Sequence, residues 1–114
     1  MKTCRVAAAQ GDIIILKVSA IPATAKAAEP VRGRWVVTHS ESGHDHVIDR
    51  PKAEMYESAD DNFVAYIKTL GDGAEIVHER EHDTHETIVL EPNRFYEVRR
   101  QREYTPEGFR RAQD

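Results

Sequence analysis

Four of the six histidines stand in two short clusters with the spacing of metal ligands: Gly43-His44-Asp45-His46 and His82-Asp83-Thr84-His85. On a β-strand, residues i and i+2 point to the same face. His44 and His46 can therefore reach one ion while Asp45 points away. His82 and His85 are three residues apart, which on a flat strand would place them on opposite faces, so this pair requires a helical turn or a bent loop.

Neutral imidazoles in sets of three or four suit zinc, and they also suit iron, nickel or copper. We therefore expect a bound Zn²⁺ or another divalent transition metal, with the ligands His44, His46, His82 and His85. Three histidines and a water would leave an open position where the metal activates the water, whereas four would close the site. For metal-assisted hydration or hydrolysis, the candidate catalytic bases are Asp45 and Glu86.

The alternative is that these histidines bind no metal and are solvated or hydrogen-bonded side chains in a polar loop and a short strand. Each pair by itself is a weak pattern, and the prediction depends on their occurring together in a short chain. His39 and His78 each end an alternating segment, so we expect them to be hydrogen bonded or solvent-facing and not ligands.

The His44-Asp45-His46 segment resembles in part the first motif of the cupins, which also places HxH on a strand. No glutamate follows His46 by three or four residues, and the downstream Gly-Pro-Gly-His pattern is missing. The resemblance therefore implies an HxH-bearing strand within a β-fold and carries over no cupin metal site.

The chain also resembles a family of small uncharacterised bacterial and phage-type proteins. The resemblance rests on Gly11-Asp12, on both histidine clusters, and above all on the segment from Tyr96 to Glu107, YEVRRQREYTPE. Asn93-Arg94 departs from the glycine expected before that segment, which affects the turn. The resemblance implies a common fold and the same histidine pairs, and it implies no activity.

The elements that must position the histidines are short strands. Asp12–Val18 is apolar on both faces at first, which predicts a strand that is central or covered on both sides. Two hairpins are expected from period-2 alternation around tight turns. The first joins Asn62–Leu70 to Ala74–Glu79, and the second joins Thr87–Leu90 to Phe95–Arg100. Further strands are expected at Arg34–His39 and His44–Ile48, with a short edge segment at Ala53–Tyr56.

About seven short strands without long helices predict a mainly β domain, either a small β-barrel or a two-sheet β-sandwich. We expect one domain over residues 1–114, with residues 1–10 loose. A short C-terminal helix is expected over residues 105–114, because Thr105 can cap it and Pro106 suits its first position.

The composition favours a soluble protein. The 114 residues carry a formal net charge of −4, and 32% of them are charged, so no overall basic field attracts nucleic acid. Cys4 is the only cysteine, which favours a reducing compartment. The start of the chain does not read as a signal peptide, and no apolar run is long enough to span a membrane. We therefore expect a cytoplasmic protein.

Arginines concentrate near the C-terminus, at Arg94, Arg99, Arg100, Arg102, Arg110 and Arg111. With the aromatic residues among them they suggest contact with nucleic acid, but the interspersed glutamates favour pairing within the protein or across a subunit interface. The sequence thus leaves three functions open: a metal-binding β protein, a structural or assembly protein such as one associated with phage, and a nucleic-acid-binding protein. We expect a homo-oligomer, whose small-molecule substrate, if any, the sequence does not indicate.

Overall fold

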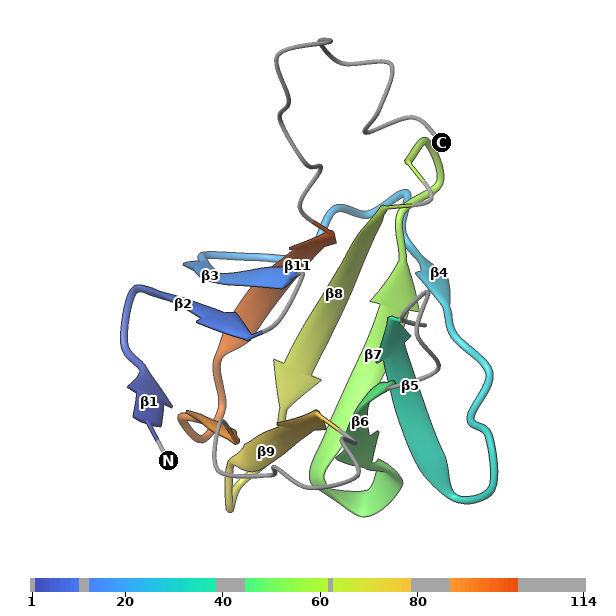
Figure 1. Ribbon diagram of the computed structural model, residues 1–114. Helices are drawn as coiled ribbons and strands as arrows, with labels where there is room; N and C mark the ends of the chain where they lie inside the picture. The colour runs from blue at the N-terminus through green and yellow to red at the C-terminus, as the bar shows by residue number, and fades with distance from the viewer. Residues whose placement is uncertain (1, 11–12, 39–44, 62, 79–86, 101–114) are drawn as a thin grey trace, which may run out of the picture.

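The computed structural model describes residues 2–10, 13–38, 45–61, 63–78 and 87–100, which form two β-sheets (Figure 1). The strands of the described residues are β1 Lys2–Cys4, β2 Ala7–Gln10, β3 Ile13–Val18, β4 Lys26–Ala27, β5 Arg34–Thr38, β6 His46–Asp49, β7 Ala53–Glu57, β8 Val64–Thr69, β9 Ala74–His78, β10 Ile88–Leu90 and β11 Phe95–Arg100. A 3-10 turn, η1 Arg50–Lys52, joins β6 to β7.

One sheet has five strands in the order β1-β10-β9-β6-β5, and the other has six in the order β2-β3-β11-β8-β7-β4. Buried side chains from both sheets form one apolar cluster between them. The predicted two-sheet sandwich is therefore confirmed, and the alternative of a closed barrel is wrong. The expected strand number of about seven was too low, because β1, β2 and β4 lack the alternation of large apolar and polar residues that marks a strand in a sequence.

Alternation along the longer strands decides which side chains enter the core. In β3, Ile13 and Ile15 are fully buried, and in β11 Tyr96 and Val98 are. β3 lies between β2 and β11, as expected for a central strand. The segment expected at an edge, Ala53–Tyr56, instead lies inside its sheet, where β7 pairs with β8 and with the two-residue β4.

Both predicted hairpins are wrong. β8 and β9 lie in different sheets, and so do β10 and β11. The consecutive strands that do pair are β2 with β3, β5 with β6, β7 with β8, and β9 with β10. The physical reason is that alternation reveals which face of a strand is buried but not which strand is its neighbour, and a tight Asp-Gly turn can serve a corner between sheets as well as a hairpin.

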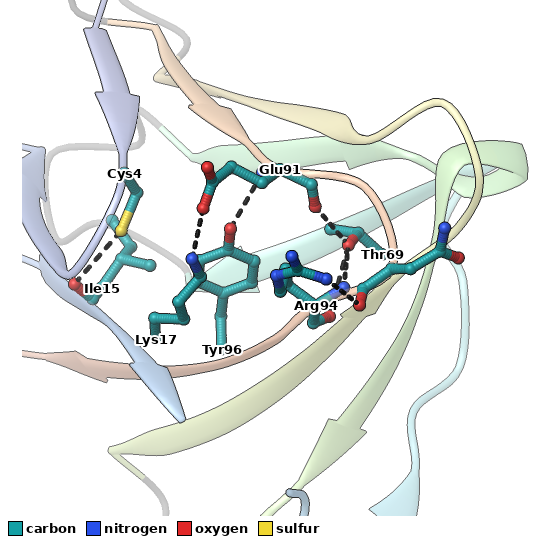
Figure 2. Close-up of polar contacts among 8 residues, drawn as sticks. Cys4, Ile15, Lys17, Thr69, Glu91, Arg94 and Tyr96 are labelled. Carbon is teal, nitrogen blue, oxygen red and sulfur yellow. Dashed lines mark hydrogen bonds and ion pairs between the residues drawn. The ribbon is translucent and has the colours of Figure 1, made fainter. Parts of the chain in front are cut away.

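Two of the corners between sheets, β8–β9 and β10–β11, are bound to each other. The carbonyl of Leu70 accepts hydrogen bonds from the backbone N–H groups of Gly73 (3.0 Å) and Asn93 (3.2 Å). The Thr69 hydroxyl donates to the Glu91 carbonyl (2.6 Å) and accepts from the Arg94 N–H (2.9 Å), as Figure 2 shows. The β8–β9 and β10–β11 crossings thereby support each other.

Strand register brings together the strand ends that flank the two histidine-bearing connections of the five-stranded sheet. His46 is the register partner of Thr38 on one side and of His78 on the other. Ile88, which begins β10, is the register partner of Ile76. The β5–β6 and β9–β10 connections therefore start and finish at adjacent strand ends. The C-terminal helix expected over residues 105–114 lies outside the described residues.

Candidate functional site

His46 is the best-defined residue of the predicted site. It is fully buried at the start of β6, where it points between the sheets like Ile48 two residues later. Its Nδ1 lies 2.8 Å from Oε1 of Gln10, a residue of β2 in the opposite sheet that is 1% exposed. The contact between His46 and Gln10 therefore joins the two sheets at this end of the sandwich.

The hydrogen bonds around Gln10 determine where the His46 proton lies. Gln10 Nε2 donates to the carbonyl of Ile76 at 2.8 Å, so the amide nitrogen faces Ile76 and the amide oxygen faces His46. An oxygen accepts, so His46 Nδ1 is the donor and carries the proton. In the neutral ring the lone pair is then on Nε2, which is the tautomer that binds a metal or a proton through Nε2.

His78 completes a buried pair of imidazoles. It is 6% exposed at the end of β9, and its ring stacks on that of His46 with centroids 4.1 Å apart and planes 16° from parallel. The in-plane lone pairs of the two stacked rings lie in two nearly parallel planes, which do not meet close to the rings. In this arrangement the two histidines do not converge on one ion at the roughly 2.0–2.1 Å of a zinc–nitrogen bond.

Of the four predicted metal ligands, the structure describes only His46. His44, His82 and His85 lie outside the described residues, as does the candidate base Glu86. The other candidate base, Asp45, directly precedes β6 and is half-buried. Within the described ranges, no three or more His, Cys, Asp or Glu side chains gather in a way that would hold a metal ion.

A second cluster of polar side chains, Lys17, Glu91 and Tyr96, lies near β1 (Figure 2). Its contacts stabilise the fold. The Glu91 N–H donates to the hydroxyl oxygen of buried Tyr96 at 2.8 Å, and the Glu91 carboxylate pairs with Lys17. The hydrogen bond from Lys17 holds the pKa of Glu91 below its ordinary value. Burial raises the pKa of Tyr96.

Cys4 is fully buried in the same region, and its Sγ lies 3.8 Å from the carbonyl of Ile15. Burial raises the pKa of its thiol, with a smaller opposing effect of Lys17 and a still smaller reinforcing effect of Glu91. A buried thiol with a raised pKa is a poor nucleophile, so Cys4 serves as a core residue.

The described arginines of the C-terminal region contact residues of their own chain. Arg99 Nε pairs with the Glu97 carboxylate on the outer face of β11. The Arg100 guanidinium lies over the ring of Phe63, 5.8 Å from its centroid. Arg94 is exposed, while Arg102, Arg110 and Arg111 lie outside the described residues. Pairing of Arg99 with Glu97 follows the expectation of a strand surface with neighbouring opposite charges.

Sequence reasoning missed two members of the buried cluster, Gln10 and His78. A usable signal existed for His78, because it lies two residues after Ile76 and four after Ala74 on the inward face of β9. No comparable signal marks Gln10, which follows a run of three alanines and reaches His46 only through the packing of two sheets.

In the part of the chain that the structure describes, no helix has the length and apolar character needed to cross a membrane. The model of one protein family, described as "Domain of unknown function (DUF8820)", matches residues 9–101. No curated protein and no solved structure matches the chain.

Proposed function

We propose that this chain, which belongs to the DUF8820 family, binds a divalent transition metal ion, Zn²⁺ by default, through a histidine site that includes His46. The observation that carries the proposal is the hydrogen bond between His46 Nδ1 and Gln10 Oε1. A metal-binding histidine generally donates its other ring N–H to an oxygen acceptor, which fixes both the tautomer and the ring orientation. Gln10 supplies such an acceptor from the opposite sheet.

The order of the strands supports the same proposal. The remaining proposed ligands are His44 in the β5–β6 connection, and His82 and His85 in the β9–β10 connection. His44 precedes His46 by two residues, so covalent geometry keeps their Cα atoms within about 7 Å. His82 follows His78 by four residues, which limits that separation to about 14 Å. Because His46 and His78 are register partners, these two limits apply from neighbouring strand ends for His44 and His82.

In this proposal His78 holds the His46 ring and does not bind the metal. The stacked geometry, with planes 16° from parallel, favours a packing role for one ring of the pair. The chemistry of the site depends on the number of ligands. Three histidines would leave a position for a water that the metal activates, with Asp45 or Glu86 as the candidate base, and four would make the site structural.

Metal analysis of the full chain, purified without an affinity tag and loaded with Zn²⁺, tests the proposal. We expect about one metal ion per chain and a higher melting temperature in the presence of the ion, since a ligand that binds only the folded state stabilises it. The double variant His82→Ala/His85→Ala should lose the ion. The matched control His78→Phe keeps a stacked ring without a ligand nitrogen and should retain it.

The absence of stoichiometric metal from the wild-type chain after exposure to zinc, iron, nickel and copper would overturn the proposal. Retention of the ion by the double variant together with its loss in His78→Phe would contradict the assigned ligands. In that case His78, and not the β9–β10 connection, would supply the nitrogen.

A further inference from the structure

The outer face of the six-stranded sheet is largely apolar. In β3 the residues Ile13 and Ile15 enter the core, so the alternate residues of that strand point outward. The same alternation applies to β7, β8 and β11. The large apolar residues that point outward, all half-buried, are Ile14, Leu16, Val18, Tyr56, Tyr66 and Phe95.

Register aligns these residues into continuous rows across the sheet. Leu16 is the partner of Glu97, which is the partner of Tyr66, and Tyr66 in turn faces Tyr56. Val18 and Phe95 begin the next row, which continues with Lys68 and Glu54. The five-stranded sheet packs on the opposite face, so this apolar surface lies on the outside of the described sandwich.

The charges on this face are balanced. Lys68 and Glu54 are register partners on β8 and β7. Arg99 pairs with Glu97, which lies two residues before it on β11. Among the described residues, two positive and two negative side chains give this face no net charge, so these residues present no field that would select a nucleic acid or an anionic membrane. A neutral face with both signs in neighbouring rows is complementary to a second copy of itself.

The outer face of the five-stranded sheet differs. There Val36, Val47 and Val77 form one row across β5, β6 and β9. Beside this row, the face carries the charged residues Arg34, Asp49 and Glu75. A groove on this face is lined by these charged residues and also by Lys52 and Asp72. The described outward positions of this sheet carry no aromatic side chain, whereas those of the six-stranded sheet carry Tyr56, Tyr66 and Phe95. Because aromatic residues are enriched in interfaces, the apolar face of the six-stranded sheet is the better candidate for an interface.

The available area is sufficient for a dimer. Six strands spaced about 4.8 Å apart span about 24 Å, and six residues along a strand span about 20 Å. The footprint is therefore about 480 Å² on each copy, close to 1,000 Å² in total, which is the lower limit for a specific interface.

We propose that this face binds the same face of a second copy in a two-fold symmetric dimer, with the two outer sheets packed about 10 Å apart. A two-fold axis that crosses the strands at the level of Val98 sets Glu97 opposite Arg99 of the partner subunit and Leu16 opposite Ile14 of the partner subunit. The proposal requires no metal and is independent of the histidine site.

Light scattering and sedimentation of the full chain between about 1 and 200 µM test the proposal in the presence of a chelator. The wild-type chain is expected at twice the 13.0 kDa mass of one copy at the higher concentrations. Leu16→Arg places a charge in a row of the face that contacts the partner subunit in the proposed dimer, and it should give a monomer with an unchanged circular dichroism spectrum. The matched control Val89→Arg substitutes a half-buried valine on the outer face of the other sheet and should remain a dimer.

Because Leu16→Arg can fail to fold, Phe95→Ser provides a second, milder test. We expect this variant to raise the dissociation constant of the dimer at least 10-fold. A wild-type chain that is monomeric at 200 µM would overturn the proposal. So would a folded Leu16→Arg variant that stays dimeric. A third outcome would also overturn it: a monomeric wild-type chain, together with a Leu16→Arg variant that melts at a lower temperature. The face would then be covered by the chain itself.

Discussion

At the scale of single residues, Gln10 has the most consequential position among the described polar side chains. It accepts a hydrogen bond from His46 Nδ1 and donates one to the Ile76 carbonyl, both at 2.8 Å and both buried. One amide thus satisfies a ring N–H and a strand carbonyl that belong to the opposite sheet. A side chain of similar size without polar atoms would leave both groups buried without this partner.

We predict that Gln10→Met lowers the free energy of unfolding by about 2–4 kcal/mol, because two buried polar groups lose their hydrogen bonds while the volume changes little. Urea denaturation of the metal-free protein measures this value. If His46 binds the metal, the same variant should also weaken metal affinity by about 10–100-fold, as loss of an orienting hydrogen bond generally does. The matched control Ala9→Met lies on the exposed side of the same strand and should change the stability little. A cost below about 0.5 kcal/mol for Gln10→Met would contradict the assigned hydrogen bonds.

Glu91 gives a prediction about acid stability. Its pKa is below the ordinary value because Lys17 donates to the carboxylate, so the folded state favours the ionised form. The stability that this contributes is present above the ordinary pKa of 4.5 and is lost as the pH falls through the lower pKa of the folded state. We therefore predict that Glu91→Gln makes the melting temperature less dependent on pH between about 5 and 3.

Thermal unfolding at a series of pH values measures this effect. Lys17→Met removes the other partner and should reduce the pH dependence in the same way. Equal slopes for the wild-type chain and both variants would show that the Lys17–Glu91 pair contributes nothing to acid stability.

At the scale of elements, three glycines form a graded test of the turns. Gly73 has φ +74°, and a Cβ there would lie 2.6 Å from the Leu90 carbonyl oxygen. Gly33 has φ +77° but no atom within 4 Å of such a Cβ, and Gly71 has neither constraint. Substitution by alanine should therefore cost about 2–4 kcal/mol at Gly73, where backbone must move, and about 1 kcal/mol at Gly33. At Gly71 it should cost close to zero.

Urea denaturation of the three alanine variants measures the order, with Gly71→Ala as the control for Gly73→Ala in the same turn. A Gly73→Ala variant as stable as Gly71→Ala would contradict the close approach of the two corners. The test is informative because the contact between these two corners is present where the sequence predicted two separate hairpins.

Much of the strand pattern could be predicted from the sequence, whereas strand pairing could not. β3 and β11 were expected within one residue of their observed bounds, because their alternation is a local property. The turn at Gly71-Asp72-Gly73 was also expected, but as a hairpin. Whether a tight turn returns a strand to its own sheet depends on the contacts of Leu70 with Asn93, which are distant in sequence.

The candidate site shows the same limit. The HxH pattern predicted His46 as a metal ligand from spacing alone, and the inward face of β9 would have drawn attention to His78. Their proximity follows from the pairing of β6 with β9, and the role of Gln10 follows from the packing of one sheet on the other. Neither relation leaves a trace in local composition.

At the scale of the whole molecule, the N-terminal residues bind both sheets. β1 pairs in parallel with β10 of the five-stranded sheet, and β2 pairs with β3 of the six-stranded sheet. Cys4 is fully buried and belongs to the common core, although it precedes the region that the family model matches. The sequence gives no strand signal here, yet the segment joins one layer to the other.

We predict that a chain lacking residues 1–10 loses its cooperative urea transition. The deletion removes two strands, a fully buried side chain at Cys4 and the Gln10 hydrogen bonds. It also exposes the edges of β10 and β3, and unpaired edges favour aggregation. Fluorescence of the single tryptophan, Trp35, reports the transition, because its ring is 8% exposed and its Nε1 donates to the Ala53 carbonyl at 2.8 Å.

The point variant Val6→Asp serves as the control, because Val6 lies between the two strands and is 76% exposed. Since its side chain is largely in water, this change should alter the free energy of unfolding by less than about 0.5 kcal/mol. A shortened chain that unfolds cooperatively at the urea midpoint of the full chain would mean that the two sheets hold together without β1 and β2. The buried positions of Cys4 and Gln10 would then contribute little to the stability of the sandwich, which is hard to reconcile with their near-complete exclusion from water.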